Sequence, residues 1–127
     1  MLLKEVLGLK PKYGKDCYFA ENATLIGDLV IGKNCSVWFQ VVIRGDVNSI
    51  RIGDRVNIQD GAVIHATYKK SKTIIGSDVS IGHNSIIHGC TIKSQVLIGM
   101  GSIIMDDCII EENSIIAAGC VLPRGTI

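Results

Sequence analysis

The three histidines of the chain are the residues whose type and spacing point most directly to chemistry. His83 and His88 lie five residues apart in IGHNSIIHGC (81–90), and His65 lies 18 residues before His83. Three neutral imidazoles can bind a tetrahedral zinc ion and leave its fourth position open for water. A solvated surface histidine is the plainer interpretation of each one taken singly, and their spacing alone leaves both interpretations open.

A repeat of six residues organises most of the chain. Large aliphatic residues recur at six-residue or related steps from Ile31 to Leu122, and the position four residues after each of them is small or β-branched. One such unit cannot bury a face alone, whereas three units close a triangular coil. Stacked coils then pair as parallel strands about 4.8 Å apart. The repeat predicts an all-β chain built as a parallel β-helix of about six coils.

We expect a single β-helix domain over residues 1–127. Residues 1–19 carry no repeat and are expected to form an N-terminal cap, and residues 20–127 form the hexapeptide-repeat coils. The repeat is interrupted directly after His65, which predicts an outward loop at 66–74. Insertions in a solenoid become loops, and loops often carry function.

Composition and charge argue against several classes of partner. The formal net charge is +1 and no long basic run occurs, so we expect no nucleic acid. No apolar stretch approaches the ~20 residues that span a bilayer, so we expect no membrane partner. Five cysteines without a CxxC pair favour a reducing compartment, and we expect a cytoplasmic protein.

Several residues outside the histidine pattern have a plain structural interpretation. Cys35, Cys108 and Cys120 occupy the small inward position and are expected in the core. Cys90, next to HG in HGC, is either a packed thiol or a reactive one. Asp106 and Asp107 are expected in a turn.

The repeat register places the histidines relative to one another. Three repeats per coil put His65 and His88 in one column, with Arg44 one coil below, whereas His83 falls on the neighbouring side above Asp60. At about 3.3 Å per residue, His83 lies too far from His88 to share one zinc ion with it. A neighbouring chain in a cyclic trimer can supply His83 instead. The same docking predicts that Arg44 meets Asp60 of the neighbour.

Four stretches resemble the γ-class carbonic anhydrases, particularly their short bacterial relatives. They are VWFQVVIRGDV (37–47), IRIGDRVNIQDGAVIH (50–65), SIGHNSIIHGCTI (80–92) and LIGMGSIIMDDCII (97–110). The resemblance covers roughly residues 20–125. It implies a left-handed β-helix and a homotrimer with Zn²⁺, or Fe²⁺ or Co²⁺, at each subunit interface. It also implies that His65 and His88 of one chain and His83 of the neighbour are the ligands.

The resemblance further implies a reaction, the reversible hydration of CO2 to bicarbonate by a metal-bound hydroxide. The implied catalytic residues are Gln59, Arg44, Asp46 and Asp60, and the implied substrate-binding residues are Asn57 and Tyr68. The best-studied active members carry acidic residues after the RGD sequence and in the loop after the first histidine. This chain has Val47 and no carboxylate between His65 and Ser77. Slow turnover is therefore expected.

Two other functions fit a hexapeptide-repeat chain. The first is a coenzyme A thioester hydrolase or acyltransferase, which uses a catalytic histidine and a groove for the coenzyme. The second is a catalytically silent trimeric scaffold that zinc holds together. Metal content separates the acyltransferase from the other candidates, and a direct hydration assay separates the enzyme from the scaffold.

Overall fold

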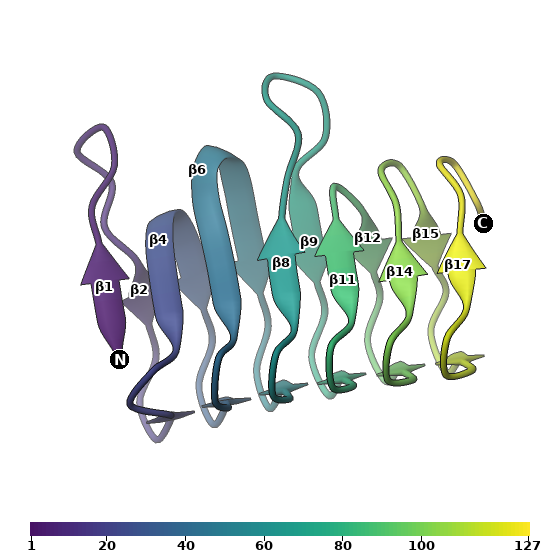
Figure 1. Ribbon diagram of the computed structural model, residues 1–127, viewed down its shortest axis with the longest axis horizontal. Helices are drawn as coiled ribbons and strands as arrows, with labels where there is room; N and C mark the ends of the chain where they lie inside the picture. The colour runs from purple at the N-terminus through teal and green to yellow at the C-terminus, as the bar shows by residue number, and fades with distance from the viewer.

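The computed structural model describes all residues from 1 to 127, and it is a left-handed parallel β-helix (Figure 1). Every element is a strand, and all pairings between named strands are parallel. No helix that could span a membrane is present.

The coils have three faces, which we call front, rear and base. The front face carries β1 (Leu2–Lys4), β4 (Thr24–Ile31), β6 (Val42–Ile52), β8 (Val63–His65), β11 (Ile86–His88), β14 (Ile103–Ile104) and β17 (Val121–Leu122). The rear face carries β2 (Lys12–Tyr13), the second halves of β4 and β6, β9 (Thr73–Ile75), β12 (Thr91–Ile92) and β15 (Ile109–Ile110). The base carries β3 (Tyr18–Phe19), β5 (Ser36–Val37), β7 (Asn57–Ile58), β10 (Ser80–Ile81), β13 (Leu97–Ile98) and β16 (Ile115–Ile116).

The stack has about seven turns, one more than the six or so coils expected from the hexapeptide repeat. Residues 1–19 supply the additional turn, because Leu3 pairs with Leu25 and Phe19 pairs with Val37 in the same register as the later coils. An antiparallel bridge between Val6 and Leu9 interrupts this turn and hides its period in the sequence. The segment therefore lies at the end of the stack where a cap was expected, and its strands pair as a coil.

The core is a set of aliphatic columns, as the repeat predicts. The central residue of each front strand points inward, so that Ile43, Ile64 and Ile87 stack with no exposed surface. Burying each such side chain contributes about 1.5–3 kcal/mol. The small position is buried at the corners, where the hydroxyl of Ser85 donates a hydrogen bond to the carbonyl of Gly99.

Two of the three cysteines expected in the core are buried there. Cys35 and Cys108 are almost fully covered, whereas Cys120 is half-buried because it belongs to the last coil of the stack. Cys90 is also buried, and burial raises the pKa of its thiol to about 12. The packed interpretation of Cys90 therefore holds, because a thiol with that pKa carries no thiolate at neutral pH.

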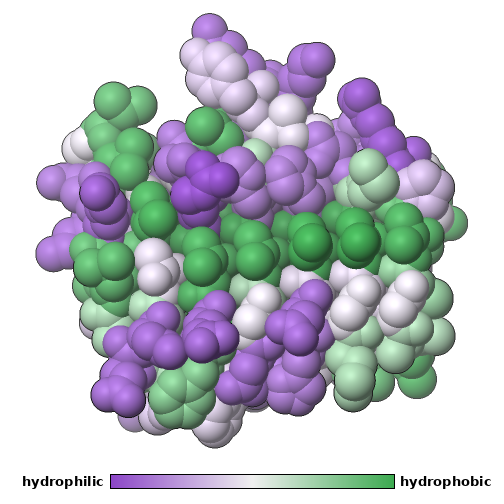
Figure 2. All heavy atoms as spheres, viewed as in Figure 1, coloured by the Kyte–Doolittle hydropathy of each residue, from purple (hydrophilic) through white to green (hydrophobic).

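The front face carries a continuous line of outward apolar side chains, which Figure 2 shows as a green row across the molecule. We call it the front stripe, and it consists of Val42, Val63, Ile86, Ile103 and Val121. All of its residues are at least partly exposed to solvent, and the exposed fraction is 37% for Val63 and 58% for Val121. A contiguous exposed apolar row of this kind is typical of an interaction surface.

Candidate metal centre

His65 and His88 end two neighbouring front strands and face each other. β8 and β11 pair in register, so that Ile64 lies beside Ile87 and His65 beside His88. Because side chains alternate along a strand, burying both isoleucines turns both histidines outward. The column predicted from the repeat register is confirmed for this pair. Their side chains are 17% and 35% exposed.

Each of the two histidines uses its outer ring nitrogen on a carboxylate. Nε2 of His65 lies 3.0 Å from Oδ1 of Asp46, and Nδ1 of His88 lies 2.6 Å from Oδ1 of Asp106. An ionised carboxylate only accepts hydrogen bonds, so each of these outer nitrogens carries the proton. The inner nitrogens, Nδ1 of His65 and Nε2 of His88, lie 3.1 Å apart. In the neutral imidazoles both inner nitrogens then present lone pairs to one another.

This arrangement fits a bound cation. Two facing lone pairs repel unless a proton or a metal ion lies between them. Nitrogens bound to one tetrahedral zinc at about 2.05 Å lie about 3.3 Å apart, close to the separation of the two inner nitrogens. Histidine ligands of metals typically donate their other N–H group to a carboxylate, which fixes the tautomer and the ring orientation. His65 and His88 therefore have the geometry of two ligands with their supporting groups in place.

Asp46 holds His65 and is itself held by Arg44. Nη1 of Arg44 lies 2.5 Å from Oδ2 of Asp46, and both residues belong to β6. Partial burial opposes ionisation, but the hydrogen bonds from Arg44 and His65 outweigh it and lower the pKa of Asp46. The two RGD residues thus lie beside a predicted ligand, as expected. Within the chain, Arg44 is paired with Asp46, and its predicted pairing with Asp60 of a neighbour stays a prediction.

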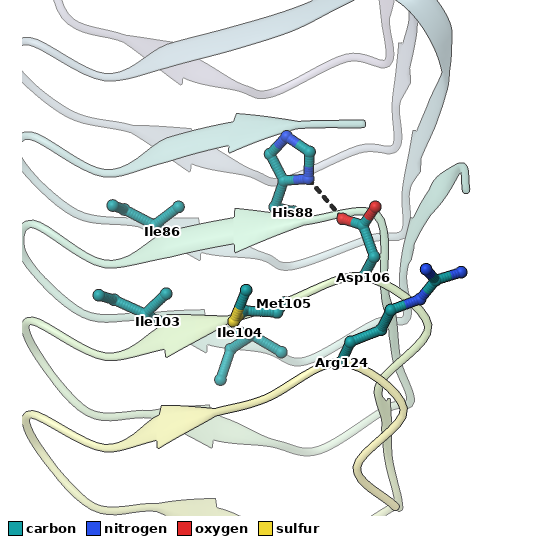
Figure 3. Close-up of a pocket in the computed structure, with 7 residues that line it drawn as sticks. All are labelled: Ile86, His88, Ile103, Ile104, Met105, Asp106 and Arg124. Atoms are coloured by element: carbon teal, nitrogen blue, oxygen red, sulfur yellow. Dashed lines mark hydrogen bonds and ion pairs between the residues drawn. The ribbon is translucent and has the colours of Figure 1, made fainter. Parts of the chain in front are cut away.

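Asp106 is a site residue that sequence reasoning missed. It lies in a turn, as expected, but its carboxylate reaches His88 of the preceding coil (Figure 3). Partial burial opposes ionisation, and hydrogen bonds from Thr67 and His88 outweigh it and lower the pKa of Asp106. The register between coils could have indicated this position. Because Ile87 pairs with Ile104, the next residues of the two coils, His88 and Met105, lie side by side, and Asp106 lies beside Gly89.

The loop predicted at 66–74 leaves the front face directly after His65. It is closed by an antiparallel bridge between Thr67 and Ser71, and the chain rejoins the stack as β9 at Thr73. Thr67 donates a hydrogen bond from Oγ1 to Asp106. Tyr68, at the tip, is 61% exposed, and the ammonium group of Lys69 lies over its ring, 5.2 Å from the ring centroid. The structure brings no other predicted site residue to Tyr68.

The remaining predicted residues gather around His83 rather than around the histidine pair. Trp38, Asn57, Gln59, Asp60 and His83 line a cavity of about 310 Å³. Nδ1 of His83 lies 3.2 Å from Oδ1 of Asp60, the residue predicted one coil below it. The amide of Asn57 donates to Oγ of Ser36 at 2.7 Å. Within one chain, no group of three potential metal ligands comes together.

A second cavity, of about 390 Å³, is lined by His88 and by residues of the coils that follow it in the stack, among them Met105 and Arg124. Figure 3 shows Ile86 and Ile103 of the front stripe on one side of it and Arg124 on the other. The cavity is therefore continuous with the front stripe and opens beside a predicted metal ligand.

Comparison with known proteins places this geometry in a family. Residues 89–124 match the family model described as bacterial transferase hexapeptide (six repeats). Gamma carbonic anhydrase 2, mitochondrial, from Arabidopsis thaliana is 38% identical over 129 residues, covering 98% of this chain and 46% of that protein. A carbonic anhydrase from Geobacillus kaustophilus is 42% identical over 105 residues, covering 83% and 57%. The chain thus spans about half the length of these relatives.

Solved structures agree with the sequence comparison. A hexapeptide transferase family protein from Anaplasma phagocytophilum superimposes with a TM-score of 0.95 at 44% identity, over 99% of this chain and 74% of that one. A putative acetyltransferase from Bacillus cereus gives 0.96 at 41% identity, over 98% and 72%. Together with the carbonic anhydrase relatives, these matches identify the chain as a γ-carbonic-anhydrase-like member of the hexapeptide-repeat family.

Proposed function

We propose that the chain forms a homotrimer with a metal centre at each subunit interface, and that this centre catalyses the reversible hydration of CO2. The observation that carries the proposal is the pair of inner nitrogens of His65 and His88, which face each other at 3.1 Å while a carboxylate holds each outer nitrogen. A bound Zn²⁺, Fe²⁺ or Co²⁺ would supply the positive charge that lowers the pKa of water to about 7 and makes a nucleophile available.

A second subunit completes the set of ligands in this proposal. One chain brings two histidines together, and zinc sites that catalyse reactions typically have three protein ligands. His83 is half-exposed at the corner between the base and the front face, and Oδ1 of Asp60 lies 3.2 Å from its Nδ1. The front stripe runs beside His65 and His88, which supports a subunit interface on this face.

The chain's own polar residues then have distinct tasks. Gln59 lines the cavity of His83, and its amide can both donate and accept, as the orientation of a small neutral substrate requires. Asp46 and Asp106 hold protons of the imidazoles rather than protons of the substrate. The loop after His65 offers no carboxylate to carry a proton to solvent. We therefore expect hydration to be slow and to respond to buffer concentration.

The transferase titles of the solved relatives keep an acyl-transfer reaction as the alternative. A single basic histidine suffices for that chemistry, whereas two facing lone pairs have no use in it.

The five unpaired thiols fit a reducing compartment such as the cytoplasm.

Mixing two inactive variants tests the proposal. His83→Ala chains lack the ligand given to the neighbour, and His65→Ala/His88→Ala chains lack the pair, so neither variant alone can form a complete site. When the two are unfolded together and refolded, a mixed trimer regains one complete site wherever the first variant's pair meets the second variant's His83. We expect recovery of zinc and of CO2 hydration only in the mixture. No recovery in a mixture shown to contain mixed trimers would contradict a shared site.

A further inference from the structure

We propose that Asp106 is a positioning residue for His88, and that Thr67 holds it in place, so that the loop after β8 sets the metal affinity of the centre. The part of this inference that concerns metal rests on the proposed function. The part that concerns the tautomer of His88 does not.

Both oxygens of Asp106 are engaged, each on a different partner. Oδ1 accepts from Nδ1 of His88 at 2.6 Å, and Oδ2 accepts from Oγ1 of Thr67, which lies 39 residues away along the chain. The side chain of Asp106 is 22% exposed. With both oxygens bound, the carboxylate can neither rotate nor turn to solvent without breaking a hydrogen bond.

Thr67 is itself fixed from two directions. Its N–H group donates to the carbonyl of Ser71 at 2.9 Å, which closes the loop. Its carbonyl accepts a hydrogen bond from Nδ2 of Asn48 at 3.1 Å, which connects the loop to β6, two residues after Asp46. The position of the Thr67 hydroxyl is therefore set by the loop, and through Asp106 the loop constrains the ring of His88.

The consequence for His88 is a single usable tautomer. While Asp106 is ionised, it accepts and never donates, so Nδ1 of His88 keeps its proton and Nε2 keeps its lone pair. A neutral histidine side chain in water favours the opposite tautomer, with the proton on Nε2. In that tautomer Nε2 has no free lone pair and cannot bind a metal. Removing Asp106 releases the ring to this tautomer and to other rotamers.

Asp107 offers a matched control next to Asp106. It binds the same loop, because Oδ1 accepts from Oγ of Ser71 at 2.6 Å, and it pairs with Arg124. Its carboxylate forms no hydrogen bond or ion pair with His88. Asp107→Asn therefore removes the same charge one residue away and weakens the same loop, while the hydrogen bond to His88 stays.

The test combines two measurements on the purified chain of 127 residues. Long-range ¹H–¹⁵N correlation of the metal-free protein reports the tautomer of His88. We expect the Nδ1–H form in the parent and in Asp107→Asn, and the Nε2–H form in Asp106→Ala. Competition against a chelator reports zinc affinity, which we expect to fall about 10–100-fold in Asp106→Ala and to stay within about twofold in Asp107→Asn.

Variants of Thr67 test the second half of the relay. Thr67→Val keeps the shape but removes the hydroxyl, and we expect it to lose less zinc affinity than Asp106→Ala and more than Asp107→Asn. Thr67→Ser restores a hydroxyl and should restore the affinity. Parent-like zinc affinity in Thr67→Val would overturn the role of the loop.

Two other results would overturn the role of Asp106: an unchanged His88 tautomer in Asp106→Ala, or an equal loss of zinc affinity in Asp107→Asn. If the parent protein binds no zinc, the proposed function fails instead. The tautomer comparison would then still support or overturn the positioning of His88 by Asp106.

Discussion

A Cβ atom placed on Gly89 would lie 2.5 Å from Oδ1 of Asp106, the oxygen that accepts from His88. Gly89 also has a φ of +60°, which favours glycine. Two features therefore favour glycine at position 89, directly after His88: the positive φ of the turn and the close approach of the Asp106 carboxylate.

The first prediction separates these two requirements. Gly89→Ala should destabilise the fold by about 1–3 kcal/mol through its backbone conformation and should also push Asp106 away from His88. Gly119→Ala has a similar φ of +73° and no atom within 4 Å of its new Cβ, so it should show the backbone cost alone. Denaturant unfolding and zinc affinity, measured on both, distinguish them. Equal zinc affinity in the two variants would show that Asp106 adapts without loss.

Thiol reactivity provides a second prediction. Cys35, Cys90 and Cys108 are buried, and burial raises the pKa of Cys35 as well as that of Cys90. The other two cysteines are partly exposed. At neutral pH we expect a thiol-specific chromogenic reagent to titrate at most two thiols in the native protein and all five after unfolding. Fast reaction of Cys90, identified by peptide mass, would contradict its burial.

A third prediction concerns the acid dependence of stability. Hydrogen bonds from Ser71 and Arg124 hold the pKa of Asp107 below its ordinary value of 3.8. Since the pKa is lower in the folded chain, ionised Asp107 stabilises the fold above about pH 3.8, and this contribution is lost as the pH falls through the folded value. Asp107→Asn should therefore unfold at a lower denaturant concentration than the parent at about pH 7, and the difference should shrink as the pH falls below 3.8. A difference independent of pH would point to shape rather than charge.

The parts of the site that follow the repeat could be predicted from the sequence. A constant period makes the register between coils a matter of counting, so the pairing of His65 with His88 and the position of Asp60 below His83 were both accessible. The handedness was not accessible in this way, because the period is the same for either hand. It came from the resemblance to a family.

The parts that depend on departures from the period could not be predicted. Thr67 reaches Asp106 from a loop whose path no repeat determines. Residues 1–19 form a coil although an antiparallel bridge breaks their period. In each case the contact joins segments whose relative position is set by packing rather than by spacing along the chain.

The last prediction tests whether the front stripe is a subunit interface. Val63 lies in the stripe two residues before His65, and Val30 lies on the rear face; the two are 37% and 38% exposed. Glutamate at either position is solvated in a single chain, so Val63→Glu and Val30→Glu should both leave the coil folded. In a trimer that buries the front stripe, only Val63→Glu places an unpaired carboxylate in an interface, which costs several kcal/mol.

Light scattering with metal analysis on the same samples reads out both consequences. The parent and Val30→Glu should have about three times the chain mass of 13.7 kDa and should retain zinc. Val63→Glu should shift towards the mass of one chain and should lose zinc although all three histidines are present, because His83 of a neighbour no longer reaches the pair. A Val63→Glu protein that stayed trimeric and zinc-bound would exclude the front stripe as the interface. One that became monomeric yet kept its zinc would show that a single chain can complete the metal centre.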